Sequence, residues 1–105
     1  MANTFKSYIN ANITALTTVY AGPASTATTV IGLSLANTGT SLATASVSVV
    51  RAGTTVYVVK NAQVPLGDSL ILFGGDQKLV IQTGDQLKVQ SDQSVDVIVS
   101  LLEIA

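Results

Sequence analysis

The chain contains neither cysteine nor histidine, and these two absences exclude much of the chemistry that proteins perform. Without cysteine there is no disulfide bond and no thiolate nucleophile, and without histidine there is no imidazole to act as a general base. Zinc sites built from nitrogen and sulfur ligands are excluded for the same reason. Because disulfides mark oxidising compartments, a chain without cysteine is compatible with either redox environment.

Charge is scarce as well. Charged residues make up 10% of the chain, against about 25% in an average soluble domain, whereas hydrophobic residues make up 48%. The few basic residues stand apart from one another along the sequence, at Lys6, Arg51, Lys60, Lys78 and Lys88. Binding of nucleic acid through its phosphates needs clustered positive charge, so we expect no nucleic-acid partner. A monomer with so little charge is poorly protected against self-association, which favours assembly.

Long hydrophobic runs are also absent. The longest apolar stretch, Val97 to Leu102, is interrupted by Ser100 and is far shorter than the roughly 20 residues that span a bilayer as a helix. The first residues, Met1 to Tyr8, lack the apolar run of a signal peptide. We therefore expect a soluble protein with no membrane partner. A chain of 105 residues fits one compact domain.

What the chain does contain is a series of strand signals. Short runs rich in Val, Ile, Leu and Thr alternate with Gly, Pro, Asn and Asp, and no stretch has convincing helical periodicity. These runs predict strands over residues 5–11, 16–21, 28–36, 44–51, 55–61, 69–73, 79–82, 86–91 and 95–104. So many short strands leave no room for crossover helices. The pattern predicts an all-β fold, an antiparallel β-sandwich or jelly roll of about eight or nine short strands, with a small closed barrel as the alternative.

Turn residues support the boundaries of these strands. Arg51-Ala52-Gly53-Thr54 predicts a tight hairpin, because Gly53 can adopt the positive φ that such turns need. Gly22-Pro23 and Val64-Pro65-Leu66-Gly67 end strands, since proline cannot donate a ladder hydrogen bond. We expect residues 13–105 to form a single β-sandwich domain, and residues 1–12 to be an N-terminal arm or an edge strand.

Several predicted strands are apolar on both faces. In contrast to the strand at 44–51, which alternates small apolar with hydroxyl residues, the last strand is apolar on one face at Val95, Val97, Val99 and Leu101, and on the other at Ile98, Leu102 and Ile104. The runs at 56–59, where Tyr57 and Val59 oppose Val56 and Val58, and at 70–73 show the same pattern. A two-layer sandwich buries only one face of each sheet, so the second faces need another cover.

These second faces, together with the aromatic N-terminal segment, are the candidate contact surface. Its predicted residues are Phe5, Tyr8, Ile9, Tyr57, Val59, Ile98, Leu102 and Ile104. Covering about six such side chains is favourable by on the order of 10 to 15 kcal/mol, which can offset an association cost of about 4 to 15 kcal/mol. Two alternatives stay open: loops or the N-terminal segment of the same chain cover the last strand, and the first strand completes the chain's own sheet instead of docking on a neighbour.

Acidic residues are the remaining candidates for chemistry. Four acidic residues lie at turns with nearly regular spacing, as in calcium-binding repeats: Gly67-Asp68, Gly75-Asp76, Gly84-Asp85 and Ser91-Asp92. The match to such repeats is poor, because each pair ends a separate strand, and ordinary turns are therefore favoured. Asp96 and Glu103 lie roughly 23 Å apart on opposite faces of one strand, so they cannot act together as a glycosidase pair. No serine elbow and no phosphate loop occurs. We therefore expect no enzymatic activity, no cofactor and no catalytic metal.

Four segments carry a resemblance to a known family. They are Val19-Tyr20, the run Thr29 to Leu33, the run Gly74 to Val80 and the C-terminal run Val97 to Ile104. Through them, the chain from about residue 18 to its end resembles a family of small virion structural proteins of tailed bacteriophages, especially phages of marine and cyanobacterial hosts. The resemblance implies a β-sandwich subunit without enzymatic activity, present in many copies in a virion that is assembled in the host cytoplasm.

Residues and resemblance together lead to one main hypothesis and two alternatives. The main hypothesis is a capsid decoration or cement subunit, a homo-oligomer and by expectation a trimer, that contacts the major capsid protein or other virion proteins. The first alternative is a neck, collar or tail ring component of the virion. The second is a carbohydrate- or receptor-binding module, because jelly rolls often serve as lectins. With no Trp and only 3 Tyr, the chain has few aromatic platforms for sugars.

Overall fold

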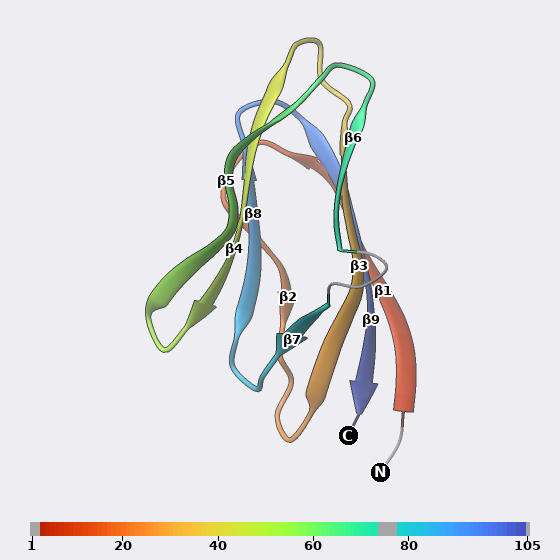
Figure 1. Cartoon of the computed structure of the whole chain (residues 1–105), viewed down its shortest axis with the longest axis vertical. Coiled ribbons are helices and arrows are strands. Elements are labelled where there is room, and N and C mark those ends of the chain that lie inside the picture. The colour runs from red at the N-terminus through yellow and green to blue at the C-terminus, as the bar shows by residue number, and fades with distance from the viewer. Residues whose placement is uncertain (1–2, 74–77, 105) are drawn as a thin grey trace.

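The computed structural model describes residues 3–73 and 78–104. All regular secondary structure in that part of the chain is β-strand (Figure 1). In chain order the strands are β1 (Asn3–Ile13), β2 (Thr17–Ala21), β3 (Ala27–Asn37), β4 (Ala43–Arg51), β5 (Thr54–Val64), β6 (Ser69–Phe73), β7 (Leu79–Ile81), β8 (Gln86–Ser91) and β9 (Val95–Ile104). Each range predicted from the sequence overlaps one of these strands, so the all-β prediction is confirmed. Within the described residues, no helix has the length and apolarity of a membrane span.

The strands form two antiparallel sheets that stack as a sandwich (Figure 1). The five-stranded sheet has the order β1-β9-β3-β6, with β7 also paired to β3, and the four-stranded sheet has the order β2-β8-β4-β5. β1 is an edge strand that pairs with β9 along most of its length, from Asn3 opposite Ile104 to Ile13 opposite Val95. The chain therefore adopts the predicted β-sandwich.

The hydrophobic core lies between the two sheets. β9 contributes Val95, Val97, Val99 and Leu101, all of which are fully buried, as their strict alternation predicts. They pack in one cluster with inward residues of both sheets, which include Val30, Leu33, Leu35, Val47, Val64, Leu87 and Val89. Because one face of each strand fills this core, the opposite face of each strand is turned outward.

The β4–β5 hairpin forms where the sequence predicts it. Arg51 pairs with Thr54 at the end of the ladder, and Gly53 adopts a positive φ of 81°. Ala52 also lies in the left-handed region, with φ 50°, which the sequence did not indicate. Two consecutive residues with positive φ are characteristic of the tight hairpin turns whose twist matches that of the strands.

β5 departs from simple alternation, which corrects one prediction. Ala62 pairs with Ala45 but Val59 pairs with Val47, so β5 has an extra residue there, and Asn61 takes a φ of 57° at this bulge. A second shift follows, because Tyr57 pairs with Ser48. Val58 and Val59 both pack against the core as a result. The prediction that Tyr57 and Val59 share a face was therefore wrong.

Candidate interaction surface

The outer face of the five-stranded sheet is apolar along its β1 edge. In the ladder between β1 and β9, Ile9 lies opposite Ile98 and Phe5 lies opposite Leu102. Residues directly opposite each other in an antiparallel pair share a face of the sheet. Phe5 is 74% exposed, Ile9 76% and Ile98 51%. These large side chains extend into solvent from strands whose other face fills the core.

The same face continues across β3 to the far edge of the sheet. Ser34 on β3 pairs with Ile98 on one side and with Ile71 on the other. Thr29 likewise lies between Leu102 and Val80. Ile71 is 71% exposed, and Val80 is exposed as well. We call this surface the apolar sheet face, and its apolar residues are Phe5, Ile9, Ile31, Ile71, Val80, Ile98, Leu102 and Ile104.

Small residues occupy the middle of the apolar sheet face. Ser100 pairs with Ser7 on β1 and with Gly32 on β3, between the two rows of large side chains. A shallow hollow of about 310 Å³ lies here, lined by Phe5, Ser7, Ile31 and Ser100 among others. The face therefore has large side chains on both sides of a central strip of small ones.

The two outer faces of the sandwich differ in polarity. Among the outward positions of β1, β3 and β9, Asp96 is the single charged residue, and its Oδ1 accepts a hydrogen bond from the Asn12 amide at 3.0 Å. The outer face of the four-stranded sheet is instead polar in its centre, with Thr18, Ser46, Ser48, Lys88 and Gln90 in register. One outer face thus suits water, and the other does not.

The structure brings most of the predicted contact residues together. Phe5, Ile9, Ile98, Leu102 and Ile104 all lie on the apolar sheet face, although Leu102 and Ile104 are half-buried. Ile31, Ile71 and Val80 were missed. Ile71 and Val80 join the face only through their pairing with β3, which the order of strands in the sequence does not reveal.

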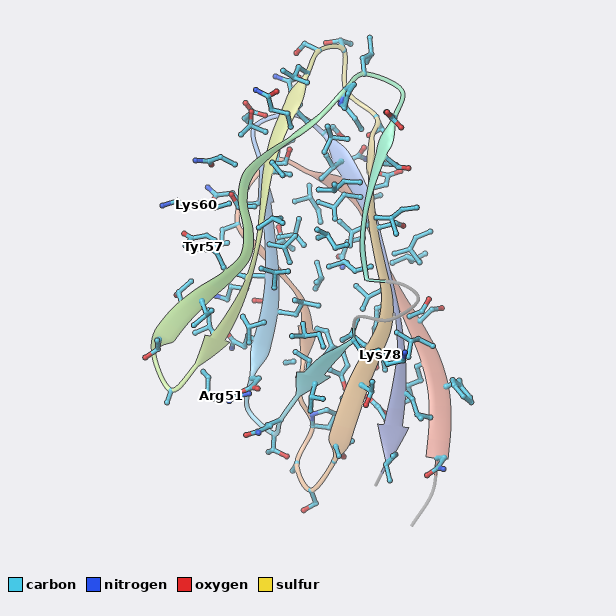
Figure 2. All side chains as sticks on the ribbon, viewed as in Figure 1. Arg51, Tyr57, Lys60 and Lys78 are labelled. Carbon is cyan, nitrogen blue, oxygen red and sulfur yellow. The ribbon has the colours of Figure 1, made fainter. Side chains whose placement is uncertain are left out.

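The other predicted contact residues lie elsewhere. Tyr8 points into the sandwich, where its ring centroid is 5.3 Å from that of Tyr20. Tyr57 is exposed on the four-stranded sheet, and the Lys60 Nζ lies 5.1 Å from the centre of its ring (Figure 2). Val59 packs against the core. The structure therefore does not join these three residues to the apolar sheet face.

A polar network lies inside the sandwich behind the apolar sheet face. Glu103, buried on β9, accepts a hydrogen bond of 2.6 Å from the Tyr20 hydroxyl and forms an ion pair of 2.9 Å with Lys6 Nζ. The Tyr20 hydroxyl also lies 2.8 Å from Thr28 Oγ1. The hydrogen bond from Tyr20 and the Lys6 ammonium lower the pKa of Glu103, whereas burial raises the pKa of Tyr20 to about 12.

This network is structural. It connects β1, β2, β3 and β9, and in the described part of the chain no buried side-chain nitrogen or oxygen lacks a hydrogen-bond partner. The signal for it was present in the sequence, because Glu103 is in phase with Val95 to Leu101 and so had to face the core. A buried carboxylate needs such partners, since burial of an unpaired charge is strongly unfavourable.

A second ion pair stands at a Gly-Asp turn. Asp85 is buried and accepts hydrogen bonds from Arg51 Nε at 2.8 Å and from Arg51 Nη2 at 2.6 Å. The amide of Gln82 donates a third hydrogen bond to this carboxylate, at 2.9 Å. The Arg51 guanidinium is the main cause of the lowered pKa of Asp85. The carboxylate is thus fully engaged by its own chain.

The other acidic turns also bind their own backbone. Asp68 accepts a hydrogen bond from the Ser69 amide, and Asp92 accepts one from the Thr44 amide, both at 2.8 Å. Gly67 has a positive φ of 75°, as expected of a turn glycine. Gly75-Asp76 lies outside the described residues. Among residues 3–73 and 78–104 there is no cluster of three or more potential ligands that could hold a metal ion.

An apolar groove separates the two sheets at the edge opposite to β1. Its volume is about 470 Å³, and it lies between the β4–β5 hairpin and β7, which stand apart in Figure 1. Val49, Val56 and Val58 line one side, and Leu79 and Val80 line the other. Arg51, which binds Asp85, also lines the groove (Figure 2). The groove therefore has no cation that its own chain leaves unpaired.

Comparisons with known proteins complete the description. No protein-family model matches the chain, and no curated protein matches it. Two solved structures of a pentameric capsid protein isolated from metagenomic phage sequences align with 90% of this chain, each with a TM-score of 0.46 and 20% sequence identity. The aligned part covers 59% of one of those chains and 60% of the other. This chain thus spans about three fifths of their length.

Proposed function

We propose that the protein is a non-enzymatic structural component of a bacteriophage particle, in which it acts as a decoration or cement subunit that stabilises the shell. The observation that carries the proposal is the apolar sheet face, because a free monomer leaves this face in water. The resemblance of residues 18–105 to small virion proteins supports the phage setting. The partners are further copies of the chain and the major capsid protein or other virion proteins.

Energetics support burial of the face in an assembly. Phe5, Ile9, Ile71 and Ile98 are each more than half exposed. Covering four such side chains is favourable by on the order of 6 to 12 kcal/mol, while association costs about 4 to 15 kcal/mol. A single contact is therefore marginal. Burial of this face becomes favourable where several contacts form together, as in an oligomer seated on a lattice.

The difference between the two outer faces supports a defined orientation. A subunit that coats a particle needs one face that binds and another that remains in water. The apolar sheet face suits the first role, and the polar face around Ser46, Lys88 and Gln90 suits the second. In this arrangement a neighbouring subunit covers the apolar sheet face, and the four-stranded sheet remains exposed.

Copy number in purified particles tests the proposal. Quantitative mass spectrometry is expected to find on the order of hundreds of copies per particle for a shell subunit, as the symmetry of a capsid requires. About six to twelve copies would instead indicate the neck, collar or tail ring. Absence of the chain from particles assembled in the host cytoplasm would overturn the virion role. Native mass spectrometry of the isolated protein reads its oligomer number and distinguishes the trimer expected from the sequence from an assembly with an even number of chains.

A further inference from the structure

We propose that the apolar sheet face binds the same face of a second copy of this chain, so that two five-stranded sheets stack about a two-fold axis. The inference rests on the proposed assembly function and names the partner of its surface. Three properties of the described residues support it: the match between rows of side chains, the area of the face and its charge.

The rows of the sheet are complementary to themselves. One row runs Ile9, Ile98, Ser34 and Ile71 from edge to edge, and another runs Phe5, Leu102, Thr29 and Val80. A two-fold axis that crosses the strands near Ser100 places each row over the other row of the partner. In these two rows every apolar position then meets an apolar position, and Ser34 meets Thr29. At the ends of β9, Asp96 lies over Ile104 of the partner. An isologous contact makes each of these matches twice.

The strip of small residues lies on the proposed axis. Ser7, Ser100 and Gly32 therefore face their own copies, and the large side chains on either side of the strip meet across the interface. Facing sheets lie about 10 Å apart, which leaves room for side chains from both sheets. Phe5 and Ile31 line the hollow of about 310 Å³ in this strip and can fill the space between the two copies.

The face is close to the size that a stable dimer needs. β9 has 10 residues, which span about 34 Å, and four strands side by side span about 19 Å. The face therefore measures about 650 Å², against roughly 800 Å² per partner in a standard protein interface. Its apolar composition resembles that of homodimer interfaces.

The low charge of the apolar sheet face favours a second copy of the chain over a partner with a charged surface. Asp96 is the single charged residue at the outward positions of β1, β3 and β9. Lys6 also lines the central hollow, but it is paired with Glu103 of its own chain. The face therefore offers little for a charged partner to recognise. An axis across the strands places the two Asp96 carboxylates at opposite ends of the interface. Two copies can therefore approach without repulsion between like charges.

Sedimentation equilibrium of the whole chain at several concentrations tests the inference. The unmodified protein is expected to reach twice the chain mass of 10.8 kDa, or another even multiple of the chain mass. Ile98→Glu is expected to weaken self-association by about 100-fold, because the substitution enters a two-fold interface twice. Ile71→Lys, on a different strand, is expected to act in the same direction. Circular dichroism and melting temperature establish that each variant is folded.

Gln90→Glu is the matched control, because it adds the same charge to the exposed centre of the four-stranded sheet. The dissociation constant for self-association of Gln90→Glu is expected to equal that of the unmodified chain. A monomer at every concentration, an oligomer with an odd number of chains, or an oligomer that the folded Ile98→Glu variant retains would each overturn the inference.

The lack of native cysteine allows a direct test of the axis. Ser100→Cys places one thiol at the centre of the face, and a short bismaleimide is expected to convert most of the protein to a covalent dimer. Gln90→Cys is expected to stay uncrosslinked under the same conditions. Crosslinking that is equal for the two variants, or stronger at position 90, would contradict the stacked sheets.

The two proposals can fail separately. A chain that is monomeric in solution yet present in many copies on purified particles would overturn the two-fold contact and leave the virion role standing. A chain that dimerises through position 100 but is absent from particles would do the reverse.

Discussion

The hydroxyl of Tyr20 on β2 donates a hydrogen bond of 2.6 Å to the Oε2 atom of Glu103 on β9, and this bond joins the two sheets inside the sandwich. The other oxygen of the same carboxylate, Oε1, pairs with Lys6 on the edge strand β1 at 2.9 Å. Phe5 and Ile9 extend from β1 to the outside. The buried network therefore anchors the edge strand that carries much of the apolar sheet face.

Removal of the Tyr20 hydroxyl is expected to destabilise the protein. Tyr20→Phe leaves Glu103 with one fewer partner, and a hydrogen bond to a charged group is worth about 1.5 to 3 kcal/mol. Urea denaturation is expected to show a loss of about 2 kcal/mol in the free energy of unfolding. The exposed Tyr57→Phe provides the control, with an expected change below about 0.5 kcal/mol. If the two substitutions changed the free energy of unfolding equally, the buried hydroxyl would contribute no more to stability than the exposed one.

Stability is expected to fall in acid. The pKa values of Glu103 and Asp85 are lowered in the folded protein from ordinary values of 4.5 and 3.8, chiefly by hydrogen bonds from Tyr20 and Arg51 respectively. A lowered pKa contributes stability that is complete above the ordinary value and is lost as the pH falls through the folded value. The free energy of unfolding, measured in urea from neutral pH downward, should therefore decline from about pH 4.5. Glu103→Gln is expected to flatten this decline, and an unchanged slope in that variant would rule out Glu103 as a cause.

A separate loss of stability is expected in alkali. Folding raises the pKa of Tyr20 from 10.0 to about 12, mainly through burial. A raised pKa gives a contribution that is complete below the unfolded value and disappears as the pH rises through the folded one. A spectrophotometric titration of tyrosinate should show a step near pH 12 that is missing from Tyr20→Phe. Persistence of the step in this variant would assign it to another group.

The alternation of inward and outward residues along a strand predicted the fold well wherever the strand contains no bulge. β9 keeps a period of two over its whole length, so its inward residues were predicted correctly. β3 and β5 contain bulges, near Gly32 and Asn61, that reverse the phase of the residues beyond them. Gly32 lies inside an apolar run, and an isolated glycine in a strand is a signal for a bulge. β5 contains no glycine near Asn61, so its bulge had no such signal and alternation failed for Val59.

Long-range pairing was beyond the reach of local patterns. Ile98 and Leu102 were found because both lie on one strand with two apolar faces. Ile71 reaches the same surface only because β6 pairs with β3, and Glu103 meets Tyr20 across a sequence separation of 83 residues. The order of strands in a sheet decides these contacts, and periodicity along one strand does not contain that order.

A methyl group at position 22 is expected to be poorly tolerated. A Cβ on Gly22 would lie 2.1 Å from the carbonyl oxygen of Gln82, where hydrogen bonds to Asp85 and Gly84 hold the two segments together. Because the contact is with backbone, Gly22→Ala should lower the free energy of unfolding by about 1 to 3 kcal/mol or more in urea. Gly39→Ala serves as the comparison, since its closest contacts of 3.3 Å are with the flexible side chain of Gln93. A neutral Gly22→Ala would contradict the close approach.

Asparagine at position 52 is expected to stabilise the hairpin. Ala52 has a φ of 50°, and a left-handed backbone costs a non-glycine residue about 1 to 2 kcal/mol, a penalty that asparagine largely avoids. Ala52→Asn should therefore raise the free energy of unfolding in urea by about 1 kcal/mol. Ala24→Asn is the control, because Ala24 is an exposed residue whose φ is not positive, and it should change little. Position 52 lies in the turn that joins β4 and β5 of the four-stranded sheet, so its substitution should leave self-association unchanged. A change in association without a gain in stability would place the hairpin in the interface instead.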